Sequence, residues 1–368
     1  MDSKEHFDTV VIGGGQAGLA MGHALRETNR DFVILEAHKR AGDSWRKRWD
    51  SLELFTTARD SSLPGLPFPA PSDTLPTKDG MAEYLELYAQ KFGLPVQLNT
   101  RVKRVYRRGK QYIIETDGRN WTASTVVVAT GAFPKQRIPD FAQDLSPAIE
   151  QLPSTAYRNR RALDAESVLV VGAGSSGAQI ALDLLPRQNV WLAGRYAGYV
   201  PSRLFGVIDT FALIRRTAFR IPTRTRVGQK VKEKFLGGGA PIVDIRESDL
   251  EQAGIERVPR VQGVRGGMPL LADGRTLDPN AIIWATGYVN DFRWIDLPVF
   301  DEDGLPLHND GAVEGEPGLY FLGLPFMIRG ASGLISGVGE DAALLAAQIE
   351  RRAVASKVSR AQPLAVIG

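Results

Sequence analysis

The sequence predicts an α/β fold made of two similar units, and two observations lead to this expectation. A short apolar strand, a Gly-x-Gly-x-x-Gly loop and a helix follow one another twice, with the loops at Gly13–Gly18 and Gly172–Gly177. In both copies the next strand ends 23 residues after the first glycine of the loop, at Glu36 and at Arg195. One such loop carries little weight, whereas two copies with the same context and spacing predict a duplicated unit.

The first copy predicts a strand, a helix, a second strand, a β-meander and a further strand. The apolar run 10–12 marks the first strand, and the turn residues Gly109 and Gly118 between alternating segments mark the meander. These elements are expected at 7–12, 19–26, 31–35, 101–123 and 125–129.

The second copy repeats this order, and a strand and a helix then return to the first unit. The repeated elements are expected at 168–171, 178–185, 190–193, 258–271 and 282–285, and the returning ones at 319–322 and 340–352. We therefore expect two Rossmann-like domains with parallel sheets and β-meanders, one inserted in the other. The first domain would be discontinuous, with bounds at 1–164 and 289–368. The second domain would span 165–288 and carry a basic helical insert near 196–243.

Each glycine loop has the residues needed to hold a pyrophosphate at a helix N-terminus. The first glycine makes the turn, the second leaves room for the phosphates, and the third lets the helix pack on the strand. These are Gly13, Gly15 and Gly18 in the first loop and Gly172, Gly174 and Gly177 in the second. The alternative is a glycine-rich turn without a ligand, which the duplication makes a poor explanation.

The residues that end the second strands indicate which nucleotide each loop binds. Glu36 can accept hydrogen bonds from both hydroxyls of an adenosine ribose and would repel a 2′-phosphate, so the first site suits FAD or NAD. Arg195 would pair with a 2′-phosphate, so the second site suits NADPH. The alternative for Arg195 is a solvated surface side chain. Arg203 is a weaker candidate for a second phosphate contact.

Two further patterns are read as parts of the same sites. Each half has an Ala-Thr-Gly sequence at the end of a strand, which either lets the chain approach a bound dinucleotide or makes a tight turn. We expect the first. Gly42, Trp45 and Trp49 follow the first unit, and the two aromatic rings either line the flavin arm or form a core pair. The Ala-Thr-Gly sequences are at 129–131 and 285–287.

Composition excludes several kinds of site. The chain has no cysteine, which excludes disulfides, thiolate zinc sites, iron–sulfur clusters and a redox-active cysteine pair. The four histidines lack zinc-site spacing, so no metal is expected. The net charge of +3 does not imply a nucleic-acid partner. No signal peptide and no run of about 18 apolar residues is seen, so we expect a cytoplasmic protein without a transmembrane segment.

The segment 203–234 is strongly basic. It holds nine basic residues against two acidic ones, together with an apolar face. We expect a lid packed over the cleft between the domains, with a solvated basic side. The alternative is a helix pair that contacts a membrane surface or a protein partner.

Taken together, these motifs resemble the flavin-containing, class B flavoprotein monooxygenases, in particular a compact bacterial branch. The resemblance covers nearly the whole chain and includes Gly42-x-x-Trp45-x-x-Arg48-Trp49 and Ala285-Thr-Gly-Tyr288. It implies FAD in the first site and NADPH, or NADH, in the second. The FAD-binding residues would be Gly13, Gly15, Gln16, Ala17, Gly18, Glu36, Gly42, Trp45, Trp49, Val102, Ala129, Thr130, Gly131, Gly337 and Val338. The NADPH-binding residues would be Gly172, Gly174, Ser175, Ser176, Gly177, Arg195, Arg203, Ala285, Thr286 and Gly287.

The same resemblance implies a monooxygenase that forms a flavin C4a-(hydro)peroxide and oxygenates small sulfur or nitrogen nucleophiles or ketones, as a monomer or homodimer. Two departures from the family pattern stand out. Pro153 replaces a histidine, and the stretch 54–59 lacks an asparagine and offers only Thr56 and Thr57. We therefore expect leakage to hydrogen peroxide. An electron-transfer reductase acting on a quinone or protein, and a flavin-binding sensor without turnover, are the alternative functions.

Overall fold

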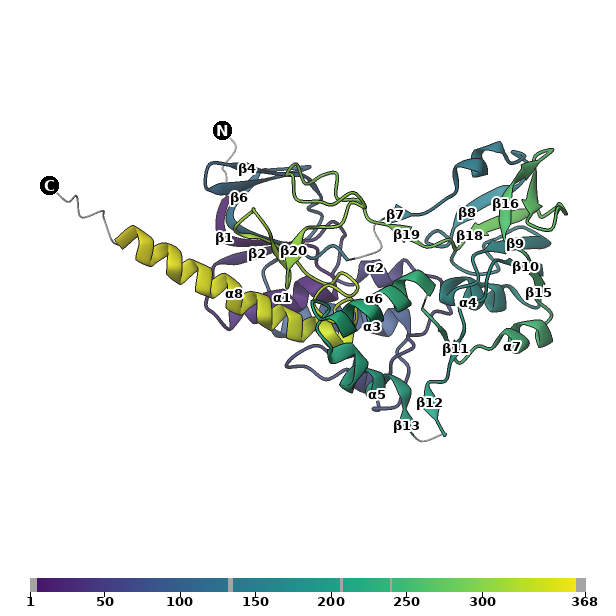
Figure 1. The fold of residues 1–368 in the computed structure, drawn as a ribbon, viewed down its shortest axis with the longest axis horizontal. Helices are drawn as coiled ribbons and strands as arrows, with labels where there is room; N and C mark the ends of the chain where they lie inside the picture. Colours follow the sequence, from purple (N-terminus) through teal and green to yellow (C-terminus); the bar gives the residue numbers. More distant parts are fainter. Residues whose placement is uncertain (1–4, 132–134, 206–207, 239, 362–368) are drawn as a thin grey trace.

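The computed structural model describes residues 5–131, 135–205, 208–238 and 240–361, which form two lobes side by side (Figure 1). Each lobe contains a sheet with a parallel core, of nine strands in one lobe and five in the other. The α/β class with two similar units, predicted from the repeat, is thereby confirmed. Among the described residues, no helix is long and apolar enough to cross a membrane.

The first lobe is built on the nine-stranded sheet. Its parallel core has the spatial order β3 (Val96–Gln97), β2 (Phe32–Leu35), β1 (Glu5–Ile12), β6 (Trp121–Val128) and β22 (Leu319–Phe321). Four antiparallel strands extend it, and they are β4 (Val102–Arg108), β5 (Gln111–Thr116), β20 (His308–Asn309) and β21 (Ala312–Val313). The expected meander is therefore present as β4, β5 and the start of β6.

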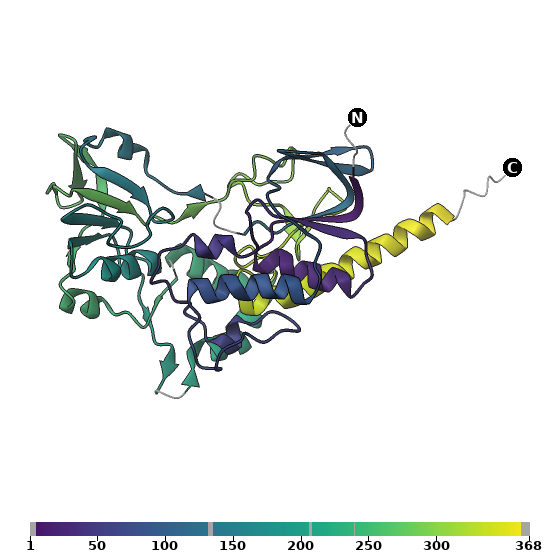
Figure 2. The same ribbon diagram turned by 180° about the vertical axis from the view of Figure 1, so that it is seen from behind.

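Helices cover one side of this sheet, as both ribbon views show (Figures 1 and 2). The helix α1 (Gln16–Arg26) packs against α3 (Lys78–Lys91) and α8 (Ile335–Ala361), while α2 (Asp43–Arg46) is a single turn after β2. The central strands carry continuous apolar runs because both faces of the sheet are covered. Val10 and Val11 of β1 and Val126 and Val127 of β6 are fully buried.

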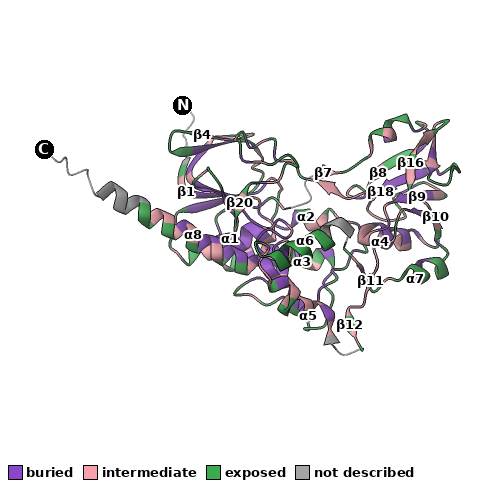
Figure 3. Cartoon of the chain, in the orientation of Figure 1, coloured by how far each residue is buried: buried purple, intermediate pink, exposed green. Residues whose placement is uncertain are grey.

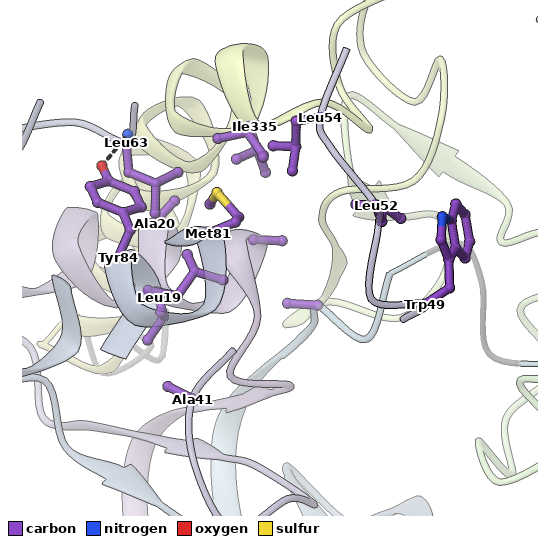
Figure 4. Close-up of a cluster of buried hydrophobic side chains, with 14 of the residues drawn as sticks. Leu19, Ala20, Ala41, Trp49, Leu52, Leu54, Leu63, Met81, Tyr84 and Ile335 are labelled. Atoms are coloured by element: carbon purple, nitrogen blue, oxygen red, sulfur yellow. Dashed lines mark hydrogen bonds between the residues drawn. The ribbon is translucent and has the colours of Figure 1, made fainter. Parts of the chain in front are cut away.

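The helix α3 was not expected from the sequence. It has an N-cap at Thr77, whose hydroxyl accepts a hydrogen bond from the backbone of Gly80 at 3.1 Å. Its buried residues Met81, Leu85 and Tyr88 recur at helical spacing. In the close-up of the core, Tyr84 of α3 accepts a hydrogen bond from the Leu63 backbone at 2.6 Å (Figure 4).

The last helix, α8, is longer than the expected 340–352. Its first half is buried in the lobe through residues such as Val338, Ala342 and Leu345 (Figure 3). Its second half leaves the body of the protein and extends away from both lobes (Figure 1).

The second lobe is a five-stranded, fully parallel sheet. Its spatial order is β15 (Glu256–Val258), β10 (Asn189–Ala193), β9 (Ser167–Val171), β18 (Ala281–Trp284) and β8 (Glu150–Pro153). Around it lie η2 (Asp140–Asp144), α4 (Ser175–Leu184), α7 (Glu247–Gln252) and the hairpin of β16 (Val261–Arg265) and β17 (Met268–Leu271). Because β8 precedes residue 165, we propose that the second domain begins before Glu150.

Two short ribbons lead into and out of the second lobe. The antiparallel strands β7 (Lys135–Gln136) and β19 (Tyr288–Val289) form the first. The parallel strands β11 (Tyr199–Val200) and β14 (Ile242–Val243) form the second and lead to the insert. The insert consists of β12 (Arg203–Leu204), β13 (Ile208–Asp209), α5 (Thr210–Arg216), η3 (Ala218–Arg220) and α6 (Arg226–Gly238).

The insert packs on the first lobe, although in the sequence it lies between strands of the second lobe. The rings of Phe219 and Phe235 pack against Phe326, with centroids 6.2 and 5.6 Å from its own, respectively. The guanidinium of Arg215 lies 3.0 Å from the carboxylate of Asp60, which is buried in the short helix η1 (Ala58–Ser61). Phe219 of the insert is thus buried against the first lobe. Both apolar and basic residues of the insert are exposed, namely Phe205, Leu213 and Val227 and the arginines Arg216, Arg220, Arg224 and Arg226. Membrane contact through 203–234 stays a prediction.

We expect Phe219→Ala to lower the free energy of unfolding by about 3–5 kcal/mol, because a buried ring is removed from a packed cluster. Phe205→Ala is the matched control, since Phe205 is 93% exposed in the same insert. It should change stability by less than about 0.5 kcal/mol. Urea unfolding monitored by fluorescence measures both. Equal effects of the two substitutions would contradict the packing of the insert.

Candidate functional site

The first glycine loop joins β1 to α1 at the carboxyl end of the parallel strands. Gly13 has a φ of +108°, and a Cβ there would lie 2.6 Å from the carbonyl oxygen of Ala129. A Cβ on Gly18 would overlap the carbonyl oxygen of Gly13. The fold itself therefore requires glycine at these two positions.

Gly15 differs from its two neighbours in the loop. It is the N-cap of α1, with φ −81° and ψ −170°, a conformation open to any residue. A Cβ built on it meets no atom of the described chain within 4 Å. No side chain caps the helix, and Gln16 and Ala17 follow directly. Glycine here leaves open space at a helix N-terminus, where an anion is favoured.

Glu36 lies beside this loop at the end of β2. Its carboxylate accepts hydrogen bonds from the Gly14 backbone at 2.6 Å and from the His38 backbone and Nδ1 at 2.8 and 2.6 Å. Burial alone would raise the pKa of Glu36, but the hydrogen bonds from His38 and Gly14 outweigh it and hold the pKa below its usual value. The side chain is therefore an ionised acceptor, as two ribose hydroxyls require. His38 was not expected to take part.

The second glycine loop repeats this geometry at the start of α4. Gly172 has a φ of +112°, and a Cβ there would overlap the carbonyl oxygen of Ala285. A Cβ on Gly177 would overlap Gly172. Gly174 has φ −88°, and a Cβ on it meets nothing within 4 Å of the described chain. The half-buried Ser175 and Ser176 then begin the helix.

The alanine of each Ala-Thr-Gly sequence lies in close contact with the first glycine of the glycine loop in the same lobe. Ala129 donates its backbone N–H to Ile12 at 2.8 Å, and Ala285 donates to Val171 at 2.7 Å. These bonds continue the sheet beyond β6 and β18. Each alanine thus has a packing role, whichever ligand the loop holds.

The residues after the alanines turn the chain. Gly131 and Gly287 have φ values of +78° and +85°. Thr130 is exposed, and the hydroxyl of Thr286 donates to the carbonyl of Arg137. A tight turn at these positions does not prevent a close approach to a dinucleotide. A cofactor contact by the threonines and glycines at 130–131 and 286–287 therefore stays a prediction.

The segment after β2 lies between the two lobes. Gly42 has a φ of +81°, and a Cβ there would lie 2.6 Å from the carbonyl oxygen of Ala82 in α3, so its role is packing. Trp45 donates its indole N–H to Gln16 of α1 at 3.4 Å. Trp49 is buried beside the core cluster (Figure 4), and its indole N–H has no partner among the described residues. A buried donor of this kind calls for a ligand acceptor.

Thr56 and Thr57 differ in what their hydroxyls contact. The hydroxyl of Thr56 lies 2.8 Å from that of Ser61, so it is already paired. The hydroxyl of Thr57 is buried and has no partner among the described residues. Since η1 packs against α8, this loop lies over the start of that helix. Thr57 is the better placed of the two for a ligand contact.

The remaining expected FAD contacts have structural roles of their own. A Cβ on Gly337 would overlap Ala331, so glycine is needed at the start of α8. Val338 is 1% exposed within the core, and Val102 begins β4. Contacts of these residues with FAD stay predictions.

The arginines around the second loop have separate environments. Arg195 is exposed and follows Gly194, which lies against the second glycine loop. Arg203 lies in β12 and pairs with Asp73 at 3.4 Å, so its role as a phosphate contact stays a prediction. Arg257, which sequence reasoning missed, donates to the carbonyl of Gly194 at 2.8 Å and braces the same strand end.

The residues present fit two dinucleotides. Each lobe has a helix N-terminus with open space in place of a side chain. The first lobe adds the ionised Glu36 and, among other buried groups without a partner in the described chain, the indole of Trp49 and the hydroxyl of Thr57. The full sequence has no cysteine, so chemistry through a protein dithiol is excluded.

Comparison with known proteins agrees with this geometry. The family model described as pyridine nucleotide-disulphide oxidoreductase matches residues 10–197. An uncharacterized oxidoreductase, CzcO-like, from Geobacillus kaustophilus is 41% identical over 92% of this chain and 97% of its own. A probable indole-3-pyruvate monooxygenase, YUCCA3, from Arabidopsis thaliana is 28% identical over 85% of this chain and 81% of its own.

Among solved structures, the flavin-containing monooxygenase from Stenotrophomonas maltophilia is similar with a TM-score of 0.78 and 27% identity, covering 95% of this chain and 99% of that one. The resemblance to flavin-containing monooxygenases, expected from the motifs, is confirmed. With the duplicated glycine loops and these matches, the chain belongs to the pyridine nucleotide-disulphide oxidoreductase family, among its flavin-dependent oxidoreductases and monooxygenases.

Proposed function

We propose that this protein is an FAD- and NADPH-dependent monooxygenase that acts on small sulfur or nitrogen nucleophiles or on ketones. The observation that carries the proposal is the pair of open helix N-termini, at Gly15 and at Gly174, where the fold does not itself require glycine. Two such cradles in one chain suit two dinucleotides.

In the first lobe, FAD would lie with its pyrophosphate at the start of α1 and its ribose hydroxyls on Glu36. The ionised carboxylate is an acceptor for hydroxyl groups and would repel a 2′-phosphate. The indole of Trp49 and the hydroxyl of Thr57 supply hydrogen bonds that the described chain does not use.

In the second lobe, NADPH would lie with its pyrophosphate at the start of α4 and its 2′-phosphate near Arg195. An exposed guanidinium gives a bond to phosphate that water and salt weaken. The selectivity over NADH is therefore modest.

Bound FAD would supply hydride acceptance and oxygen activation, which no side chain of the protein can provide. The chain's own part is to orient the two cofactors, exclude water and stabilise charge on oxygen. The stretch 54–59 offers Thr57 for this last role and no asparagine. Because few side chains of this stretch can stabilise charge on oxygen, we propose that part of the NADPH consumed yields hydrogen peroxide. For the same reason, a reductase is the second candidate function.

We expect Gly15→Ala to abolish FAD binding without destabilising the apoprotein, because the added Cβ would enter only the space kept for the pyrophosphate. Gly18→Ala is the contrasting variant, since its Cβ overlaps the backbone and should lower stability with or without FAD. Apoprotein melting and FAD titration by fluorescence separate the two. Full FAD binding by Gly15→Ala would contradict the site.

We expect NADPH to be preferred over NADH by about 10- to 100-fold in affinity, corresponding to about 1–3 kcal/mol from a charge-assisted bond to Arg195. The preference should shrink with added salt and disappear in Arg195→Ala, while Arg203→Ala should keep it. Michaelis constants for both nucleotides measure this. If Arg195→Ala retained the preference, another group would have to read the 2′-phosphate.

We expect NADPH oxidation to proceed without an oxygenation substrate, with release of hydrogen peroxide. Loss of one preorganised donor to an oxyanion costs about 2.7–4 kcal/mol in other enzymes, so Thr57→Val should release still more peroxide per NADPH and Thr57→Asn less. Oxygen-electrode and peroxidase-coupled assays, with and without a thioether, give the ratio. Tight coupling of NADPH use to product in the wild type would contradict the expectation.

A further inference from the structure

The Arg48–Tyr288 contact joins the two lobes. Nη1 of Arg48 donates to the hydroxyl of Tyr288 at 2.8 Å, and the guanidinium carbon lies 5.8 Å from the ring centroid. Arg48 follows α2 in the first lobe. Tyr288 begins β19, directly after the Ala285–Gly287 turn that borders the second glycine loop.

The segment that carries Arg48 contacts both lobes. On one side, Trp45 donates to Gln16, the first residue of α1. On the other, the Asp50 backbone donates to Arg158 at 2.7 Å, and the Asp50 carboxylate accepts from the Asn159 amide at 2.7 Å. Residues 45–50 are therefore a short bridge from the helix that would hold FAD to the lobe that would hold NADPH.

Besides a buried apolar cluster shared by the two lobes and the insert packed on the first lobe, two short chain connections join the lobes. The chain passes between the lobes at two short ribbons, β7–β19 and β11–β14, each with two paired residues in either strand. In Figure 1, β7 and β19 lie between the lobes, while β11 lies lower, beneath α4 of the second lobe. Short ribbons and apolar packing set the approximate position of the lobes but are not directional, whereas the Arg48–Tyr288 hydrogen bond favours one orientation of the strand end.

We propose that Arg48 is a positioning residue for hydride transfer, which acts through Tyr288 to fix the strand end of the second lobe relative to the flavin side of the first. This rests on the proposed function. Reacting atoms must lie about 3–3.5 Å apart, and an error of about 1 Å lowers such a rate by about 100-fold. Arginine suits the role because it donates in a fixed direction and stacks on an aromatic ring at the same time.

The test is anaerobic stopped-flow reduction of the FAD-loaded enzyme by NADPH. In Arg48→Met and Tyr288→Phe we expect the limiting rate of flavin reduction to fall about 10- to 100-fold, with the apparent NADPH dissociation constant changed less than about threefold. Arg48→Lys should recover part of the rate. The double variant Arg48→Met/Tyr288→Phe should be no slower than Arg48→Met alone, since both remove one contact.

Three controls isolate the contact. Dithionite reduction and FAD content should be unchanged in all variants, and small-angle scattering of the apoproteins should show a larger spread of lobe positions in Arg48→Met. Within the first lobe, the guanidinium of Arg104 stacks 4.8 Å from the ring of Tyr106 and donates its hydrogen bonds to Asp296. Arg104→Met and Tyr106→Phe, which remove a stacked arginine and a tyrosine hydroxyl away from the lobe boundary, should leave the rate unchanged.

The outcomes separate this inference from the function on which it rests. If NADPH failed to reduce the wild-type flavin, the proposed function would be wrong. If the wild type were reduced and Tyr288→Phe matched it, the inference would be overturned. A loss of NADPH affinity at an unchanged limiting rate would also overturn it, because Arg48 would then bind nucleotide directly.

Discussion

Both lobes depend on one constraint, the close approach of a glycine turn to the end of a neighbouring strand. Gly13 lies against the carbonyl of Ala129, and Gly172 lies against that of Ala285, closer than any side chain permits. This approach sets where the helix begins after the turn, and hence where its N-terminal N–H groups lie. The open space at Gly15 and Gly174 exists because the other glycines fix the loop around it.

The two lobes use the same local design, and they differ at the strand ends. Glu36 is buried, hydrogen-bonded and ionised, whereas Arg195 is exposed. Under the proposed function, Glu36 would select its nucleotide by charge in a protected environment and Arg195 would do so in contact with water. Such a difference suits one nucleotide that stays bound and one that is exchanged.

The sequence predicted the repeated units well, because glycine loops and apolar strands depend on neighbours within the same segment. It missed α3, although the N-cap residue Thr77 and the helical spacing of Met81, Leu85 and Tyr88 signal it, because α3 lies outside the repeated units on which the prediction was built. Contacts between distant segments left no local signal. The pairing of β8 with β18, the seat of the insert on the first lobe and the partner of Arg48 depend on how the lobes are arranged, which spacing does not encode.

The pairing of β7 with β19 has a consequence for how such a chain arises. The second lobe leaves and rejoins the first through antiparallel neighbours, with Gln136 opposite Tyr288. Directly opposite residues in such a pair lie about 5 Å apart, a gap that a two-residue turn closes. The host lobe is thus interrupted at what amounts to a single hairpin. Gene duplication followed by insertion of one copy into a hairpin of the other would reach this architecture without any rearrangement of the host sheet.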